Sequence, residues 1–143
     1  MYKWYADAQV CYAYISDFTN YGLDKLADGM AKASDPVPTD PEQLGRYYAA
    51  LNFGRSKWFT RGWTLQELIA PKDVQFFDVN WTFIAHRSEL TRTISDITNI
   101  DVSILDGTRR ITTVSIAKRM SWAAKRETTR VEDQAVSPLI IDV

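Results

Sequence analysis

Residues 8–15 form a nearly uninterrupted apolar run, which ends at the polar pair Ser16 and Asp17. A run of this length fits a strand that is buried on both faces, as strands of parallel sheets are. A second strand is predicted over residues 73–79, directly after a short amphipathic helix. Strand, crossover helix and strand form a βαβ unit, so the sequence predicts an α/β fold. The carboxyl ends of the two strands would carry Asp17 and Asp78.

The crossover helix is predicted over residues 61–70. Thr60 can cap its amino end, and Pro71 cannot extend it because proline has no backbone N–H to donate. Its apolar face is expected to comprise Thr64, Leu65, Leu68 and Ile69. The adjoining face is expected to comprise Trp63, Gln66, Glu67 and Ala70. Glu67 would then lie beside buried side chains, where partial loss of water raises the pKa of a carboxyl group. From spacing alone, an ordinary surface glutamate and a site for proton or cation chemistry both remain open.

The segments around this unit are less regular. Residues 2–7 resemble the end of a helix. Residues 20–56 contain many glycines and prolines and are predicted to form a long loop, with a short helix near residues 43–51. Beyond residue 81 the chain is expected to be helical, with one helix capped by Ser88 and ending near Asn99.

A further helix is predicted over residues 113–126. Its apolar side would carry Ile116, Met120 and Ala124, which recur at four-residue spacing. A solvated basic face would carry Lys118, Arg119, Lys125 and Arg126. Residues 128–135 could begin one more helix, which Pro138 would interrupt.

Composition limits the classes of function. The 143 residues suffice for one domain, and the net charge of −1 gives no general attraction to nucleic acid. With Cys11 and His86 as the sole cysteine and histidine, one chain can build neither a disulfide nor a Cys/His zinc site. We expect Cys11 to be a buried, inert thiol and His86 to lie in a solvated loop. We expect no cofactor. The 13% aromatic content fits either a dense core or a partner surface.

The amino end shows no long apolar region, and no stretch approaches the length of a membrane span. A cytoplasmic location is therefore expected, without a transmembrane helix.

Three blocks of the chain resemble the fungal heterokaryon-incompatibility (HET) domain. They are YADAQVCYAY at residues 5–14, WFTRGWTLQELIAP at 58–71 and SIAKRMSWAAKRETTRVED at 115–133. Family-motif positions in the second and third blocks are Gln66, Arg119, Trp122, Arg130, Glu132 and Asp133. The resemblance implies a role in non-self recognition and programmed cell death. The partners it implies are other HET or signalling proteins, or a second copy of the chain.

The resemblance also implies what the chain lacks. The family begins with a strand, a helix and a second strand, which would precede Met1, and residues 136–143 depart from the family pattern. The expected arrangement is therefore a single partial HET domain with a flavodoxin-like parallel sheet and flanking helices, its amino-terminal strands missing. It would divide into a strand region (1–19), a variable loop (20–56), a helix and strand core motif (57–80) and a helical region (81–143).

HET domains are in turn similar to Toll/interleukin-1 receptor (TIR) domains, several of which cleave NAD with a glutamate. The TIR motif aligns with Trp63 to Leu68, so the resemblance makes Glu67 the catalytic candidate. Trp63 would be a stacking surface and Arg61 a phosphate contact, with packing and a surface ion pair as the alternatives. The expected function is a truncated or non-catalytic interaction module. The alternative is a TIR-like hydrolase that takes NAD as substrate once another chain completes the pocket.

Overall fold

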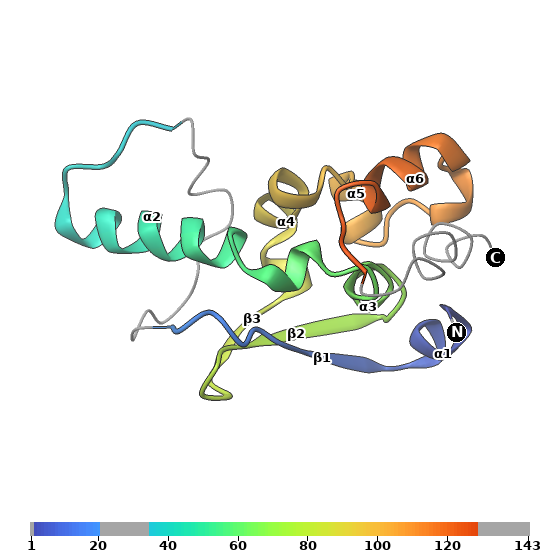
Figure 1. Ribbon diagram of the computed structural model, residues 1–143, viewed down its shortest axis with the longest axis horizontal. Coiled ribbons are helices and arrows are strands. Elements are labelled where there is room, and N and C mark those ends of the chain that lie inside the picture. The colour runs from blue at the N-terminus through green and yellow to red at the C-terminus, as the bar shows by residue number, and fades with distance from the viewer. Residues whose placement is uncertain (1, 21–34, 129–143) are drawn as a thin grey trace.

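The computed structural model describes residues 2–20 and 35–128 (Figure 1). In chain order, with η for a 3-10 helix, the elements are α1 (Tyr2–Asp7), β1 (Val10–Tyr14), α2 (Pro41–Gly54), η1 (Lys57–Thr60), α3 (Thr64–Ile69), β2 (Asp73–Phe77), β3 (Phe83–His86), η2 (Arg87–Glu89), α4 (Thr91–Thr98), α5 (Val102–Leu105), η3 (Ile111–Thr113) and α6 (Ile116–Ala123).

The described strands form one sheet in the order β1, β2, β3. β1 and β2 are parallel, with Val10 opposite Asp73 and Tyr14 opposite Phe77, as the βαβ prediction requires. β3 pairs with β2 in the antiparallel direction, so the sheet is mixed and the prediction of a purely parallel sheet is wrong. The prediction that all structure beyond residue 81 is helical is wrong for the same reason.

The two faces of the sheet differ. Ala13, Phe76 and Ile84 are buried on the face that packs against the helices, and Figure 1 shows α2 to α6 gathered on that side. On the other face Tyr12 is 64% exposed. β1 is therefore buried on one face only, which corrects the expectation for residues 8–15. Alternating exposure is normal for a strand of a sheet with one solvated face.

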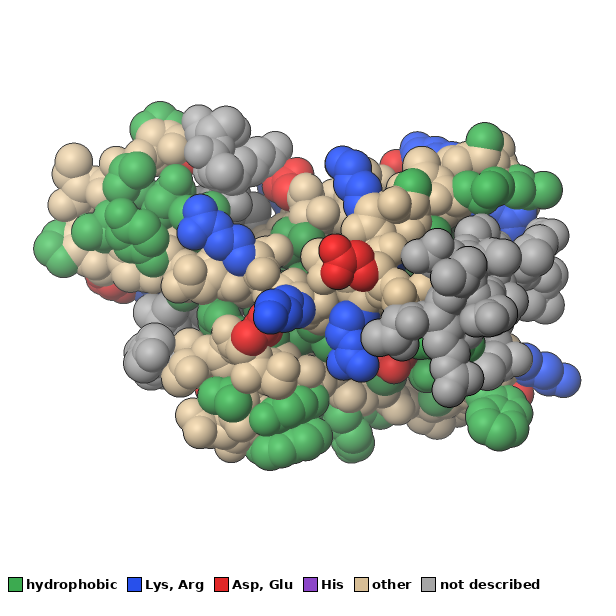
Figure 2. All heavy atoms as spheres, viewed as in Figure 1, with side chains coloured by type: hydrophobic (Ala, Val, Ile, Leu, Met, Phe, Trp, Pro, Cys, Tyr) green, Lys and Arg blue, Asp and Glu red, His purple; other side chains and the backbone are tan. Residues whose placement is uncertain are grey.

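Aromatic side chains supply both a core and a surface. In the core the ring of Phe53 packs edge-on against Phe76 and Phe59, at centroid distances of 5.4 and 5.1 Å. On the exposed side Tyr14 stacks on Trp81 at 4.6 Å. Figure 2 shows hydrophobic side chains gathered where β1 and the β2–β3 connection lie in Figure 1. The dense core is therefore confirmed, and part of the aromatic content lies on an exposed surface.

The region predicted as a long loop contains a 14-residue helix, α2. The Asp40 side chain accepts a hydrogen bond from the Gln43 backbone N–H at 3.0 Å, and Pro41 occupies the first turn, where its missing donor is not needed. The predicted helix near residues 43–51 is therefore confirmed and longer than expected. Residues 21–34 of that predicted loop lie outside the described chain.

The helix predicted from Ser88 begins later, at Thr91, because Ser88 lies in η2. Its predicted end is confirmed: Asn99 closes α4 in the left-handed conformation, with φ of 60°. His86 is not a solvated loop residue. It ends β3, and its Nδ1 lies 3.0 Å from the Asp73 carboxylate.

Candidate functional site

The segment that leads to Glu67 is bent rather than continuously helical. η1 is capped by the Ser56 hydroxyl, which accepts from the Trp58 backbone N–H at 3.2 Å. Arg61 is extended, with φ of −77° and ψ of 140°, and α3 begins only at Thr64. The predicted helix over residues 61–70 is thus shorter at its amino end. Thr60 is not its cap, because the Thr60 hydroxyl donates to the Lys57 carbonyl at 2.9 Å.

Residues 126–128, which follow α6, hold Arg61 and Gly62 in this extended form. The Glu127 N–H donates to the Thr60 carbonyl at 2.5 Å, and the Gly62 N–H donates to the Glu127 carbonyl at 2.9 Å. A Cβ at Gly62 would clash with the Thr128 methyl carbon, so any other residue at this position requires the Thr128 side chain to move. The 126–128 segment therefore fixes the backbone that precedes α3.

Arg87 fixes the other end of α3. Its buried guanidinium donates to the carbonyls of Leu68, Pro71 and Lys72 at 2.7, 3.0 and 2.9 Å. These carbonyls lie at and just beyond the end of the helix, where no intrahelical donor remains. The helix that carries Glu67 is thus held at its carboxyl end by Arg87 and at its amino end by residues 126–128.

Glu67 lies on α3, partly buried. Burial raises the pKa of its carboxyl group, and the positive charge of Arg61 opposes that rise. The carboxylate makes no hydrogen bond or ion pair with any described residue. The expected partial desolvation of Glu67 is observed, and the carboxylate is free to accept a proton or a ligand.

Tyr5 on α1 and Cys11 on β1 face the same carboxylate. Burial raises the pKa of each, and the charge of Glu67 raises it further. For Cys11 the pKa reaches about 11, although Arg87 acts in the opposite direction. The thiol therefore stays protonated at neutral pH, which fits the expected inert cysteine.

The other predicted site residues differ in their exposure to water. Arg61 is exposed and lies near enough to Glu67 to lower its pKa, and Trp63 is partly buried one turn before it. Gln66, which was expected on the face that adjoins the apolar one, is 0% exposed, and neither atom of its amide has a partner. The buried surface of α3 therefore extends beyond the expected apolar face. Among the remaining motif positions, Arg130, Glu132 and Asp133 lie outside the described residues.

The helix α6 is turned the opposite way from the prediction. Ile116 and Met120 are 58% and 50% exposed, whereas Arg119 and Trp122 are only 6% and 3% exposed. Of the four residues expected on a solvated basic face, Lys118 and Lys125 are exposed, Arg126 is partly buried and Arg119 is buried. Spacing of three and four residues from Arg119 through Trp122 to Arg126 is equally helical and could have signalled this orientation.

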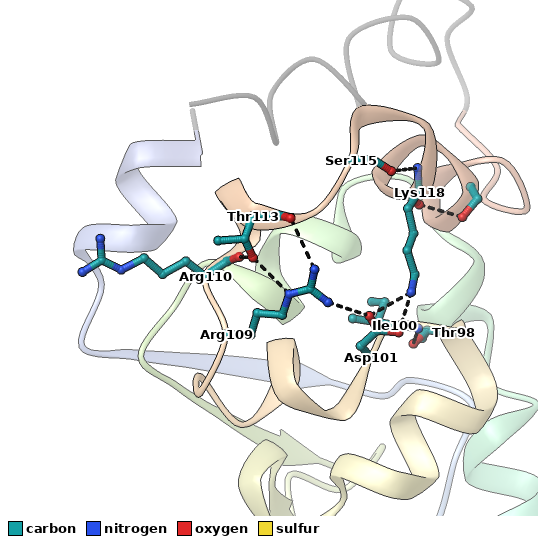
Figure 3. A network of polar contacts seen from close by, with 9 residues as sticks. Thr98, Ile100, Asp101, Arg109, Arg110, Thr113, Ser115 and Lys118 are labelled. Atoms are coloured by element: carbon teal, nitrogen blue, oxygen red, sulfur yellow. Dashed lines mark hydrogen bonds and ion pairs between the residues drawn. The ribbon is translucent and has the colours of Figure 1, made fainter.

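Lys118 forms an ion pair in addition to its contact with water. Its Nζ lies 2.9 Å from both oxygens of Asp101, and Arg109 lies 3.5 Å from the same carboxylate. Figure 3 shows both cations pointing at Asp101 from opposite sides, while the guanidinium of Arg110 points away. This network joins the start of α5 to α6.

The strand-end carboxylates Asp17 and Asp78 serve the fold. Asp78 is buried and accepts three backbone N–H groups, from Asn20, Asn80 and Thr82, at 2.8 to 3.0 Å. Asp17 accepts from the Ser56 hydroxyl and the Lys57 N–H. A cavity of about 280 Å³ lies beside Asp17, and Glu67 does not line it.

Within residues 2–20 and 35–128, none of the helices has the length and hydropathy that a membrane crossing requires. The same residues contain no cluster of three or more side chains suited to a metal ion.

No family model and no solved structure matches the chain. One curated protein is 41% identical to it over 137 residues, which is 96% of the chain. The chain is therefore related to the fungal HET proteins, and its resemblance to that family is confirmed. The relative is the vegetative incompatibility protein HET-E-1 of Podospora anserina. The chain spans 9% of the length of that relative.

Proposed function

We propose that the chain acts in fungal vegetative incompatibility, the recognition of non-self after cells fuse, and that it does so as an interaction module. The observation that carries this proposal is the 41% identity to a vegetative incompatibility protein, which extends over almost the whole chain. Programmed cell death of the fused cell is the proposed outcome.

The cavity beside Asp17, about 280 Å³ in volume, is not lined by Glu67. Small-molecule sites are usually concave and enclose most of the ligand surface. This cavity therefore does not place a substrate at Glu67, and the interaction module is supported by the identity to HET-E-1.

A second candidate function rests on the environment of the same carboxylate. Glu67 is partly buried, has a raised pKa and makes no bond to a described residue, which is typical of carboxylates with a chemical role. In a TIR-like reaction it would stabilise the positive charge that develops on ribose as nicotinamide leaves NAD. Trp63 would then form a wall and Arg61 would contact a phosphate. In this proposal another protein contributes residues to the pocket.

One pair of measurements separates the two functions. The chain and its Glu67→Gln variant are expressed in fungal cells that fuse with a compatible strain, and death of fused cells is counted. An interaction module predicts the same effect from both proteins. The hydrolase predicts that Glu67→Gln abolishes death and that only the unmodified chain depletes NAD.

The control variant is Glu42→Gln, which alters an exposed glutamate on α2 that pairs with Arg46. It should behave as the unmodified chain does in both assays. If neither the unmodified chain nor the control changes the survival of fused cells, the role in incompatibility is wrong. NAD loss measured with purified protein, alone and mixed with HET-E-1, tests the hydrolase independently.

A further inference from the structure

The strand β1 lies at one edge of the described sheet, and β2 is the one described strand that pairs with it (Figure 1). Ile15, directly after β1, donates its backbone N–H to the Phe77 carbonyl of β2 at 2.8 Å. Residues two apart in a strand present their backbone groups to the same side, so the odd-numbered residues of β1 face β2. The N–H and C=O groups of Val10, Tyr12 and Tyr14 therefore point outward, away from the sheet.

This outer edge of β1 lacks the features with which edge strands usually avoid pairing. Its sequence, VCYAY, contains no charged residue and no proline, and its pairing with β2 has no bulge. Val10 and Tyr12 are 37% and 64% exposed, so solvent reaches the edge around them. No other described residue forms a hydrogen bond with the outward backbone groups. Such an edge is a template on which another strand can pair.

The opposite edge of the described sheet is better protected. Its strand, β3, has four residues, and the last of them, His86, donates its backbone N–H to the Glu89 carboxylate at 2.9 Å. A backbone donor that is already bonded cannot pair with an added strand, and a charged side chain at an edge discourages pairing. Strand addition is therefore favoured at β1.

We propose that β1 pairs in the antiparallel direction with β1 of a second copy of the chain, across a twofold axis beside Tyr12. A twofold axis perpendicular to the sheet brings the same edge of both copies together and reverses the direction of one strand. With the axis at this position, Tyr12 lies opposite itself and Val10 lies opposite Tyr14 of the second copy. All three outward-facing residues then form hydrogen-bonded pairs, each of which exchanges two N–H···O bonds.

The side chains and the charge of β1 suit a second copy as the partner. The twofold axis keeps the open faces of both sheets on the same side, so the two Tyr12 rings lie next to each other. Aromatic residues directly opposite each other stabilise an antiparallel pair. Because β1 carries no charge, two identical strands meet without electrostatic repulsion.

The pairing names a partner for the interaction module, and its biological role rests on the function proposed above. Five residues of strand span roughly 17 Å, so the interface is smaller than the roughly 800 Å² per partner that stable complexes bury. The dimer is therefore expected to be weak and to form where copies of the chain are concentrated. Glu67 has no part in this pairing.

Sedimentation velocity of the purified chain, over a wide range of concentration, tests the association. The apparent mass should rise with concentration from the 16.4 kDa of one chain toward twice that value. A mass that stays at 16.4 kDa at the highest soluble concentration would overturn the pairing. That result would leave the proposed role in incompatibility intact, because the role is decided by the survival of fused cells.

Charge variants at residue 12 test which edge is used. Tyr12→Lys should raise the dissociation constant of the dimer by about tenfold or more, because like charges directly opposite each other are destabilising. Since residue 12 pairs with itself, a mixture of Tyr12→Lys and Tyr12→Glu should form the dimer that neither variant forms alone. The matched control is Phe83→Lys, which changes a 43% exposed ring on the same face of the sheet at its other edge. An equal loss of association in the control, or no dimer in the mixture, would overturn the proposal.

A disulfide tests the register. Hydrogen-bonded pairs of antiparallel strands place their Cα atoms about 5.5 Å apart, a separation that a disulfide spans. Tyr12→Cys, made together with Cys11→Ala so that no other thiol is present, should therefore form a disulfide-linked dimer on mild oxidation. Phe83→Cys with Cys11→Ala should remain a monomer under the same conditions. Equal cross-linking of the two proteins, or none with Tyr12→Cys, would refute the pairing through Tyr12.

Discussion

Replacing Gln66 by methionine is expected to stabilise the protein. The Gln66 side chain is fully buried in α3, and its amide oxygen and nitrogen both lack a hydrogen-bond partner. An unpaired buried polar group costs about 1–3 kcal/mol. Methionine has a similar length, a similar helix propensity and no strong polar atom, so it removes this cost with little change in packing.

The expected increase in the free energy of unfolding is about 1–3 kcal/mol, because two unpaired groups are removed while some contacts adjust. For a chain of this size each kcal/mol corresponds to a rise of about 4 °C in melting temperature. Urea unfolding followed by circular dichroism measures the free energy, and an unchanged dependence on urea concentration would show that the compactness of both states is preserved.

The matched control is Gln43→Met on the exposed surface of α2, which should change the free energy of unfolding by less than about 0.5 kcal/mol. Destabilisation by Gln66→Met, with Gln43→Met neutral, would refute the reasoning. It would mean that the Gln66 amide has a bonding partner in solution, such as an enclosed water molecule.

Three further predictions concern the surroundings of Glu67. Burial raises the pKa of Glu67, so the ionised carboxylate destabilises the fold. Glu67→Gln should therefore raise the free energy of unfolding at neutral pH and leave it unchanged well below pH 4.5. Urea unfolding at the two pH values tests the direction of this change. Burial raises the pKa of the Cys11 thiol most, and the charge of Glu67 raises it further. Glu67→Gln should therefore speed the alkylation of Cys11 by iodoacetamide. An equal rate in the two proteins would contradict this electrostatic contact. Gly62→Ala should destabilise the protein by about 1 kcal/mol, the lower end of the cost of overpacking, because its Cβ would force the Thr128 side chain to move. Adding Thr128→Ala should recover most of that loss, and strictly additive effects in a double-mutant cycle would disprove the clash.

The sequence predicted β1, α3 and β2, because the signals for these elements lie within a few consecutive residues. The apolar run around Cys11 and the proline after α3 defined a parallel strand pair and its crossover helix, and both are present. β3 was missed because it has four residues, Phe83–His86, with too short a pattern to distinguish a strand from a helix. Its antiparallel pairing depends on contacts with β2, which no local pattern encodes.

The orientation of α6 shows why a hydrophobic stripe can mislead. Ile116 and Met120 fit one helical face, and Arg119 with Trp122 fits another. Hydrophobicity alone favours the first face. The structure buries the second face. The indole of Trp122 and the methylene groups of Arg119 are large and apolar, so their burial removes much surface from water. For the candidate site, the position of Glu67 was predictable, but the contacts of Arg87 and of residues 126–128 were not, since they join distant parts of the chain.

The bonds between residues 60–62 and Glu127 also have a kinetic consequence. The contact between Arg126 and Arg61 spans 65 residues of sequence, so it closes a long loop and forms slowly compared with the helices it joins. During synthesis from the amino end, α3 leaves the ribosome well before residues 126–128 do. The backbone before Glu67 therefore acquires its final conformation late, and a nascent chain carries this glutamate without its surroundings until the third block of the family motif has emerged.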